Sequence, residues 1–489
     1  MENRANSQEP NIFILLGIPF HNVTMQETLE YVDGMIARRN PAYLATANLD
    51  FAAQAGQDVE LQRILFEAEL VLCDGTPLVW ASRWLGAPLR ERVAGSDLLP
   101  FLFAHAEKMG HRIYFLGSSD EVLETVLEKC AVQYPKLVIC GAYSPPYAKL
   151  LDLNDAEIAG RVRAVSPDIL LVGMGCPKQE KWIYKNYRDL GVPVCIGIGA
   201  SLDFIAGKFR RAPVWMRVSG LEWIFRLMQE PRRLFSRYLF DLLFFVRTLR
   251  NQRRLLRMKG GEGTAAGCAE MSHLENARQY GWSGRIDARA VNEKIARPIL
   301  PDHDKPNVVL DCSNITFIDS TGLGLFIRSF RQCKAAGGAF VVLNPSQPVE
   351  KMLSVMKLDR LIPVARSSEE VSHLLKAFAP GQPGASSYSA SSGKLTIPMD
   401  GDITAASVGL CESLLVPAWN QNPGAATLQL DLAKVSFIDS SGLGLLVKTF
   451  KLVKQRPGAV LEIINVSSNV RNVIKLANLG DMFGLTSGS

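Results

Sequence analysis

The sequence predicts an α/β protein, with a parallel-sheet domain in its N-terminal half and two small α/β domains in its C-terminal half. Two observations carry this prediction. From Asn11 to about Gly207, short Val/Ile/Leu-rich runs alternate with longer helical patterns, and the C-terminal half contains one motif twice. At 489 residues, of which 47% are hydrophobic, the chain has enough apolar material for several cores and is too long for one.

The first domain is predicted to be built on short apolar strands. Ile12–Leu16 is far too short for a signal core or a membrane span and is predicted as a first buried strand. The clearest further strands are Tyr43–Thr46, Leu70–Cys73, Arg112–Leu116, Leu137–Cys140, Ile169–Val172 and Val194–Gly197. Most run directly into Gly, Asn, Asp or Ser, as strands do where their C-terminal ends open onto a ligand crevice.

Cysteine usage indicates a reducing compartment. The nine cysteines form no Cys-x-x-Cys pair and no cluster with histidine at ligand spacing. We therefore expect reduced, mostly buried thiols, no structural metal and a cytoplasmic protein. Cys176 and Cys195 are interpreted as small buried residues rather than nucleophiles.

The net charge of +6 is unevenly distributed. Between Lys208 and Lys259 there are fourteen Lys or Arg against three Asp or Glu, a net charge of +11, which leaves −5 for the remainder. Aromatic residues interleave with these arginines, which favours an interfacial helix that docks on an anionic membrane. Its most apolar stretch, Tyr238–Val246, is too short to span a bilayer. The alternative is a helical hairpin packed on the domain, whereas nucleic-acid binding is disfavoured because no known motif accompanies the charge.

A glycine-rich stretch, Gly260–Gly267, marks a flexible linker, and beyond it the sequence repeats itself. Thr316–Leu325 matches Ser436–Leu445, with Phe-Ile-Asp-Ser-(Ser/Thr)-Gly-Leu-Gly-Leu in both copies. Two copies are too few for a solenoid, so each is predicted to be a complete small domain. The expected segments are an α/β core at 10–207, a basic helical appendage at 208–259, a linker at 260–275, a first repeat at 276–378, a second linker at 379–389 and a second repeat at 390–486.

Polar and glycine-rich turns follow several predicted strands. In Leu72–Leu78 a strand ends in Asp74, followed by a Gly-Thr-Pro turn. An aspartate at a strand tip can act as a general base or a ligand anchor, although the local sequence equally suits a helix cap. The other turns are Thr46–Asn48, Arg92–Asp97, Gly173–Trp182 and Gly197–Phe204.

Glycine-rich strand-to-helix turns bind phosphates through backbone N–H groups and the helix N-terminus. None of these turns is a Walker loop or a strict Gly-x-Gly-x-x-Gly fingerprint. ATP hydrolysis, NAD binding and a Rossmann-type oxidoreductase are therefore not supported. The convergence of all five turns favours a nucleotide-sugar site.

This ordered set resembles the WecB/TagA/CpsF family of bacterial glycosyltransferases over roughly residues 10 to 255. The matching motifs are Thr46/Asn48, Asp74-Gly75-x-Pro77, Arg92-x-x-Gly95-Ser96-Asp97, Gly-x-Gly-x-Pro-Lys-Gln-Glu-x-Trp and Gly-x-Gly-x-x-x-Asp-Phe. The resemblance implies an inverting, metal-independent transfer without a cofactor, from a UDP-sugar to a polyprenyl-diphosphate-linked sugar. The donor is typically UDP-N-acetylmannosamine or its uronic acid, although the departures at Ala47 and Leu49 leave the donor open.

The resemblance also implies roles for single residues. Asp74 would be the general base that deprotonates the acceptor hydroxyl, with Thr46, Asn48 and Gln179 around the sugar. Arginines and backbone donors would stabilise the departing UDP. The remaining substrate-binding candidates are Arg92, Ser96, Lys178, Gly197, Gly199, Arg210 and Arg211. The alternative for each of these Lys and Arg residues is that it is a solvated surface charge that contacts no substrate.

In each repeat a strand delivers Ile-Asp-Ser to a turn, and Gly-Leu-Gly-Leu opens a helix. A phosphate on a serine at a helix N-terminus gains favourable contacts with the backbone N–H groups and the helix dipole, and it changes the surface charge by nearly two units. The alternative is that the serine is an ordinary helix cap. The pattern resembles the STAS domain, the sulfate transporter and anti-sigma factor antagonist module. That resemblance implies that Ser320 and Ser440 are phosphorylated by anti-sigma kinases.

Together these features predict a glycosyltransferase of cell-surface polysaccharide synthesis, peripheral at the inner face of the cell membrane and controlled by tandem STAS modules. The expected partners are a nucleotide-sugar, a lipid-linked acceptor, an anionic membrane and an anti-sigma-type serine kinase or phosphatase, with no nucleic acid and with homo-oligomerisation left open. The alternative is an anti-anti-sigma-type signalling protein with a non-catalytic first domain. Because the linkers are predicted to be flexible, we expect regulation by recruitment and no rigid docking of the repeats.

Overall fold

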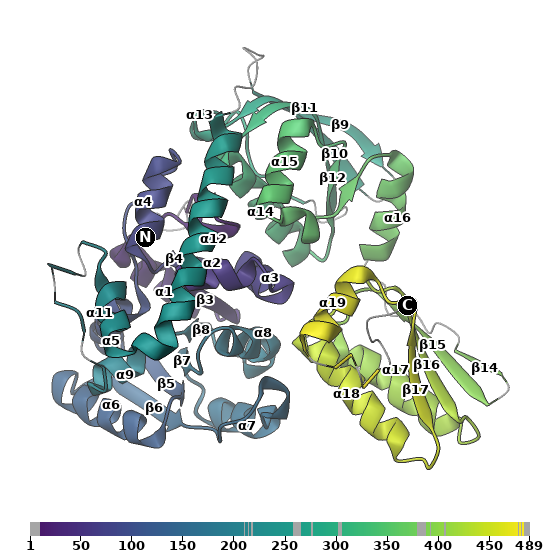
Figure 1. The fold of residues 1–489 in the computed structure, drawn as a ribbon, viewed down its shortest axis with the longest axis horizontal. Coiled ribbons are helices and arrows are strands. Elements are labelled where there is room, and N and C mark those ends of the chain that lie inside the picture. Colours follow the sequence, from purple (N-terminus) through teal and green to yellow (C-terminus); the bar gives the residue numbers. More distant parts are fainter. Residues whose placement is uncertain are drawn as a thin grey trace. The chain divides into compact units, whose positions relative to one another are not determined.

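The structure is a computed structural model that describes residues 10–209, 211–213, 215–216, 219–257, 266–274, 277–301, 306–378, 388–391, 393–404, 407–477, 479–480 and 482–483. The chain divides into two compact units, Met1–Val371 and Ser372–Ser489. The first unit contains the N-terminal domain and the first repeat up to Val371, within the last helix of that repeat, and the second unit contains the second repeat (Figure 1).

A six-stranded parallel sheet forms the centre of the N-terminal domain, in the order β4-β3-β8-β7-β5-β6. Its strands are β3 (Ala42–Ala47), β4 (Leu70–Cys73), β5 (Arg112–Gly117), β6 (Val138–Tyr143), β7 (Ile169–Gly173) and β8 (Val194–Gly197). Each overlaps a strand predicted from its apolar run, and the predicted fold class is confirmed. All neighbouring pairs are parallel, so the six C-terminal ends lie at one edge of the sheet.

Helices cover both faces of this sheet (Figure 1). They are α1 (Met25–Arg38), α2 (Leu49–Ala55), α3 (Val59–Glu67), α4 (Thr76–Trp84), α5 (Gly95–Met109), α6 (Asp120–Gln133), α7 (Asp155–Val165), α8 (Lys178–Leu190) and α9 (Ser201–Ala206). Alternate residues of a strand point to opposite faces. Leu170 and Val172 of β7 join one apolar core, whereas Ile169 and Leu171 join the other. Burial on both faces explains why these strands are continuous apolar runs in the sequence.

A short antiparallel hairpin, β1 (Ile12–Leu15) and β2 (Ile18–His21), precedes the sheet. Its turn places Leu16 at a φ of 54°, because a two-residue turn that matches the twist of the strands requires positive φ values. His21 ties the hairpin to β4, since its Nδ1 accepts a hydrogen bond of 2.9 Å from the Val71 amide. The hairpin is therefore connected by a side chain to an edge strand of the parallel sheet.

The described part of the basic segment includes the helices α11 (Glu222–Gln229) and α12 (Pro231–Arg257). Figure 1 shows α12 running along the N-terminal domain toward the first repeat. Its buried Gln252 donates a hydrogen bond of 2.8 Å to the Ile14 carbonyl and accepts one of 3.2 Å from the Leu16 amide. One side of α12 therefore packs on the domain, as in the alternative of a packed helical hairpin. Within the described part of the chain, no helix is long and apolar enough to cross a membrane.

The first repeat contains a five-stranded sheet in the order β13-β12-β11-β10-β9. Its elements are β9 (Gly267–Leu274), β10 (Ala277–Ile286), α13 (Ala288–Asn292), β11 (Asn307–Ile318), α14 (Ser320–Ala335), β12 (Phe340–Leu343), α15 (Gln347–Val355), β13 (Val364–Ala365) and α16 (Ser368–Phe378). Strand β9 lies inside the segment 260–275 that was predicted to be a linker. It pairs antiparallel with β10, so these residues belong to the repeat. Small and polar residues in Gly267–Leu274 hide the strand pattern in the sequence.

The second repeat has a four-stranded sheet in the order β14-β15-β16-β17. Its elements are β14 (Ser389–Ser391), β15 (Lys394–Asp400), α17 (Val408–Gln421), β16 (Thr427–Lys434), α18 (Ser440–Lys454), β17 (Val460–Ile464) and α19 (Ser468–Leu476). Both repeats are therefore small α/β domains, as predicted. Most of the second predicted linker, 379–389, lies outside the described residues.

The first repeat packs directly on the N-terminal domain. Strand β1 lies between them, because its Phe13 and Leu15 join the core of the N-terminal domain whereas Ile12 and Ile14 join the core of the repeat. Helix α14 lies against β1, and Phe66 of α3 is buried in the same apolar cluster. The expectation that flexible linkers leave the repeats undocked is therefore wrong for the first repeat.

His21 should make this region sensitive to pH. Burial, together with the charges of Arg331 and Arg328 on α14, holds the pKa of His21 well below its ordinary value. Below a pH of about 6.5 the unfolded chain therefore binds a proton that the folded chain does not. The free energy of unfolding should fall with the pH, by up to about 1.4 kcal/mol per pH unit.

We expect the thermal midpoint of the first unit to drop more in the wild type than in His21→Asn when the pH is lowered from about 7.5 to about 5.5. Asparagine retains an acceptor near the position of Nδ1 but does not titrate. Glu69, which pairs with Arg331 at 3.5 Å, is present in both proteins and cancels in the comparison. Calorimetry of both full chains provides the measurement, and equal pH dependence would contradict the role of His21.

Candidate active site

The C-terminal ends of the parallel strands gather the polar turns that the sequence predicted. Asp74 follows β4, Asn48 follows β3, and glycine-rich turns follow β7 and β8. Because neighbouring parallel strands end at the same edge, these turns meet there. Backbone bonds join neighbouring turns: the Asp74 amide donates to the Ala47 carbonyl, and the Ile198 amide donates to the Val172 carbonyl, both at 2.9 Å.

The Asp74 side chain is held by the start of α5. Its Oδ2 accepts a hydrogen bond of 3.3 Å from the Gly95 amide, at a helix N-terminus that favours negative charge. Burial nevertheless raises the pKa of Asp74 above its usual range, although the charges of Arg226 and Arg92 oppose this change. A carboxyl group with a raised pKa is a better proton acceptor than an ordinary aspartate.

A network of charges lies beside this carboxyl group. Arg92 pairs with Asp97 at 2.5 Å and with Glu222 at 3.3 Å. Arg211 pairs with the other oxygen of Asp97 at 2.7 Å and donates to the Ser96 hydroxyl at 3.0 Å. The structure thus brings three predicted substrate-binding residues, Arg92, Ser96 and Arg211, into one cluster, which we call the arginine cluster.

Helix α11 covers the arginine cluster. Its Arg226 pairs with Glu222 one turn earlier at 3.3 Å and lies 4.8 Å from the centre of the Phe204 ring. Gly220, just before α11, lies so close to α4 that a Cβ there would stand 2.9 Å from the Thr76 methyl group. Glu222 had no role in the sequence-based prediction. The available signal was its charge, because it is one of only three acids in the basic segment.

Gln179 connects two of the glycine-rich turns. Its Oε1 accepts hydrogen bonds from the amides of Gly175 and Gly199, at 3.1 and 3.0 Å, and its Nε2 donates to Glu180 at 2.6 Å. A Cβ at Gly197 would stand 2.8 Å from this Nε2, so β8 can approach the Gln179 side chain this closely only with glycine at position 197. Gln179 is 1% exposed, and its side chain therefore fixes the turns rather than lying open to a ligand.

Glu180 is a buried carboxyl group next to Gln179. Burial raises the pKa of Glu180 to about 7. Among the described residues, no hydrogen-bond partner reaches its Oε2. A carboxyl group with this pKa changes its charge near neutral pH, close to the glycine turns. The sequence motif contained Glu180, but only the fold reveals its burial.

Thr46 and Asn48 are held by the local backbone. Thr46 Oγ1 donates to the carbonyl at the end of β8 at 3.3 Å, whereas Asn48 caps α2 by accepting a backbone hydrogen bond of 3.2 Å. A Cβ at Gly95 would lie 3.2 and 3.3 Å from the hydroxyl oxygens of Thr46 and Ser201. These two hydroxyls therefore lie beside the residue whose amide binds Asp74.

Lys178 is engaged by the loop after β6. Its Nζ donates to the Ala148 carbonyl at 2.6 Å and lies 5.4 Å from the centre of the Tyr147 ring. Burial lowers the pKa of this lysine. Arg210, another predicted substrate-binding cation, lies outside the described residues.

An open cleft of about 440 Å³ adjoins the arginine cluster. Its walls come from the start of α1 and from the segment before and within α5. The lining residues are Thr24, Met25, Gln26, Leu29, Glu91, Arg92, Asp97 and Phe101. Because Arg92 and Asp97 belong to both, a molecule bound in the cleft would reach the arginine cluster.

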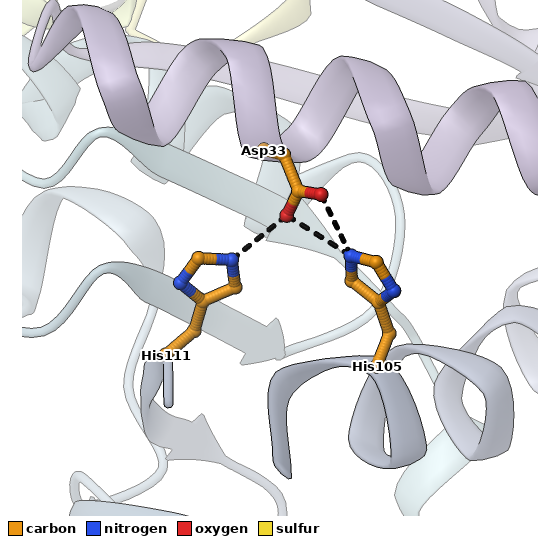
Figure 2. Close-up of side chains that lie close together, drawn as sticks. All are labelled: Asp33, His105 and His111. Atoms are coloured by element: carbon orange, nitrogen blue, oxygen red, sulfur yellow. Dashed lines mark hydrogen bonds and ion pairs between the residues drawn. The ribbon is translucent and has the colours of Figure 1, made fainter. Parts of the chain in front are cut away.

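A second cluster of titratable groups joins α1 to α5. Figure 2 shows Asp33 between His105 and His111, with a ring nitrogen of each histidine directed at the carboxylate. The shortest separations are 2.9 and 2.8 Å, and the ligand atoms lie within 4.8 Å of one another, a spacing that could hold a metal ion. However, the three groups already bind one another, and His105 lies about 15 Å along α5 from Gly95. The cluster was missed because its members are distant in sequence.

The repeated Asp-Ser motif begins a helix in both repeats. Asp319 caps α14 by accepting hydrogen bonds of 2.8 and 2.9 Å from two amides of the first turn, and Asp439 caps α18 at 2.8 and 3.0 Å. Ser320 and Ser440 are the first residues of their helices, and they are only 3% and 5% exposed. A modifying enzyme could therefore reach either serine only after local opening.

Comparisons with known proteins agree with this architecture. The glycosyl transferase WecG/TagA/CpsF family matches residues 13–259, and the STAS domain matches residues 269–371 and 387–488. An N-acetylglucosaminyldiphosphoundecaprenol N-acetyl-beta-D-mannosaminyltransferase of Staphylococcus aureus (strain MW2) is 30% identical over 236 residues, 48% of this chain and 90% of the relative. A relative of the same description from Bacillus spizizenii is 33% identical over 192 residues, 39% of this chain and 73% of the relative.

Among solved structures, an anti-sigma factor antagonist from Mycobacterium paratuberculosis is 18% identical, with a TM-score of 0.19, and the match covers 23% of this chain and 95% of that chain. The first family match contains the parallel sheet, the arginine cluster and both basic helices. The STAS matches contain the two Asp-Ser motifs. Both resemblances drawn from the motifs are confirmed. This chain therefore belongs to the WecG/TagA/CpsF family of glycosyltransferases and carries two STAS domains after its transferase domain.

Proposed function

We propose that this protein transfers N-acetylmannosamine, or its uronic acid, from a UDP-sugar to a polyprenyl-diphosphate-linked sugar, as a step in cell-surface polysaccharide synthesis. The activity in the relatives' names supports the reaction class. The observation that carries the proposal is the partly buried Asp74 carboxyl group, which is held by Gly95 beside the arginine cluster. The carboxyl group of Asp74 can remove a proton, and the arginines beside it can receive a departing diphosphate.

The proposed reaction is an in-line displacement with inversion. Asp74 takes the proton of the acceptor hydroxyl while that oxygen forms a bond to the anomeric carbon. The bond between this carbon and the UDP oxygen breaks on the opposite face, and its electron pair leaves with UDP. Guanidinium groups and backbone amides stabilise the growing negative charge. In this proposal Arg92 and Arg211 exchange part of their contact with Asp97 for the diphosphate.

Replacing Asp74 by asparagine should lower turnover by about 100-fold to 10,000-fold. The amide preserves the shape of the side chain and its bond to Gly95, but it cannot accept a proton. The measurement is UDP release with a lipid-diphosphate-sugar acceptor and a panel of UDP-sugars. Affinity for UDP, measured by titration calorimetry, should change little.

Asp189→Asn is the matched control, because Asp189 is an exposed aspartate in the last turn of α8. Its turnover should equal that of the wild type. Undiminished turnover of Asp74→Asn would refute its role as the base. If the wild type released no UDP with any donor, the non-catalytic scaffold in a signalling protein would be the better explanation.

We further propose that α12 binds an anionic membrane surface at the inner face of the cell membrane. Its side away from the core carries four apolar residues that are 47% to 64% exposed, at the spacing of one helix face. These residues are Phe235, Leu239, Leu242 and Leu243. Exposed arginines lie on both sides of them along the helix, including Arg232, Arg247 and Arg250. An exposed apolar stripe bordered by arginines suits insertion at the level of the lipid headgroups.

The double substitution Leu239→Glu with Leu243→Glu should weaken binding to vesicles that contain anionic phospholipid by at least about tenfold, because each leucine would lose apolar contact with the lipid. Vesicle co-sedimentation measures this effect. Val132→Glu is the control, since Val132 on α6 is 85% exposed and lies outside the proposed surface. Unchanged vesicle binding in the double variant would rule out this role of α12.

The two STAS domains are proposed to regulate the transferase through phosphorylation of Ser320 and Ser440 by an anti-sigma-type serine kinase, reversed by a phosphatase. The position of each serine at a capped helix N-terminus supports this proposal, because a phosphate there would gain contacts with the helix dipole. Recruitment remains the proposed mode for the second STAS domain. The first STAS domain is docked on the transferase domain, so a mode of regulation other than recruitment is proposed for it.

A further inference from the structure

The first STAS domain contacts the transferase domain through one face of α14. Gly324, Arg328, Arg331 and Lys334 recur every three or four residues and therefore form a stripe along the helix. Gly324 lies so close to β1 that a Cβ there would stand 2.2 Å from the Ile12 carbonyl oxygen. Only a glycine lets the helix and the strand approach in this way.

The rest of the stripe makes polar contacts with the transferase domain. These are Arg328 with the Pro10 carbonyl at 3.0 Å, Arg331 with Glu69 at 3.5 Å, and Lys334 with Glu67. Burial alone would raise the pKa of Glu67, but Lys334 and Arg63 lower it to about 2. Glu67 is therefore charged at neutral pH and presents a fixed negative partner to the helix.

The centre of the contact is apolar and its margin is polar. Ile12 and Ile14 of β1 and Phe66 of α3 are buried in the core of the STAS domain. On the other side, Lys357 donates to the Gly56 carbonyl, and Gln62 donates to the Met356 carbonyl at 3.1 Å. Stable interfaces between proteins share this arrangement of an apolar centre with a polar rim.

Ser320 lies on the same stripe, one helical turn before Gly324. Its neighbour Thr321 lines the narrow crevice of about 10 Å³ that remains between α14 and β1, together with Ile12. A phosphate on Ser320 would bring nearly two negative charges and three oxygens to this place. The crevice beside Thr321 is too small for that group.

We propose that docking of the first STAS domain and phosphorylation of Ser320 exclude each other. The transferase domain of the same chain then competes with the serine kinase for the face of α14 that carries Ser320. This switch rests on the proposed phosphorylation of Ser320, and it adds that docking on the transferase domain controls that phosphorylation. Ser440 belongs to the other unit and is not part of this switch.

The docked domain also contacts a residue that binds the strand leading to Asp74. Arg331 lies 3.2 Å from His21 Nε2, and His21 Nδ1 accepts from the Val71 amide in β4. Because Nδ1 is the acceptor, Nε2 of the neutral ring carries the proton, so Arg331 makes an electrostatic contact rather than a hydrogen bond. Release of α14 removes the contact of Arg331 with His21, whose other ring nitrogen binds Val71, three residues before Asp74. Turnover should therefore respond to docking.

The test is hydrogen–deuterium exchange on full-length proteins that carry phosphoserine at position 320 or at position 440, introduced during synthesis. Undocking exposes β1, so its amides should exchange at least about tenfold faster in the protein modified at 320. The protein modified at 440 is the matched control and should exchange like the unmodified protein at β1.

Gly324→Ala tests docking without phosphate. Alanine favours a helix over glycine, so the STAS domain should remain folded, whereas the added methyl group would collide with the Ile12 carbonyl. We expect the same faster exchange at β1. Gly444→Ala, at the corresponding position of the second repeat, should leave β1 unchanged.

Unchanged exchange at β1 in both the phosphoserine-320 protein and Gly324→Ala would overturn the proposal. Faster exchange throughout β11 and β12 would also count against it, because the domain would then be unfolding rather than undocking. The readout requires no transferase turnover. The switch can therefore fail while the proposed reaction stands, and the reaction can fail while the switch stands.

Discussion

Strand β1 holds the first unit together because its two faces are buried in different domains. Phe13 and Leu15 complete the core of the transferase domain, whereas Ile12 and Ile14 complete the core of the first STAS domain. Burial contributes roughly 25 cal/mol for each Å² of apolar surface removed from water. Displacing the strand would remove this contribution from both domains at once.

The same strand relates the first STAS domain to the candidate active site. Gln252 of α12 binds the backbone of the hairpin, and α12 follows α11, whose Glu222 and Arg226 lie over the arginine cluster. On the other side, His21 binds β4, which leads to Asp74. The docked domain thus packs on α12 and reaches β4 through His21. Recruitment through flexible linkers, the expected mode, does not describe this first domain.

Local patterns in the sequence were sufficient for the parts of the fold that depend on local periodicity. Apolar runs predicted the six strands of the central sheet, and turn residues placed Asp74 at the end of one strand and Gln179 in the segment that follows another. The unbroken apolar run Ile12–Leu16 predicted a buried strand and carried the signal that both faces are covered. It could not identify the second covering domain, because that contact joins residues far apart in the chain.

The remaining features depend on tertiary packing, which periodicity does not encode. Glu222 reaches Arg92 only because α11 folds back over the sheet edge. Asp33 meets His105 and His111 through the pairing of α1 with α5. The sequence predicts a linker at β9 because the small and polar residues there show no strand alternation. The strand is stabilised by pairing with β10.

Scanning calorimetry of the full chain tests most directly whether β1 joins the two domains. If it does, the transferase domain and the first STAS domain unfold in one transition. Ile14→Ala, which removes buried contacts at a cost of about 2–5 kcal/mol, then lowers the midpoint of that whole transition. A separate transition for the first STAS domain, at a temperature that Ile14→Ala does not change, would contradict a shared strand.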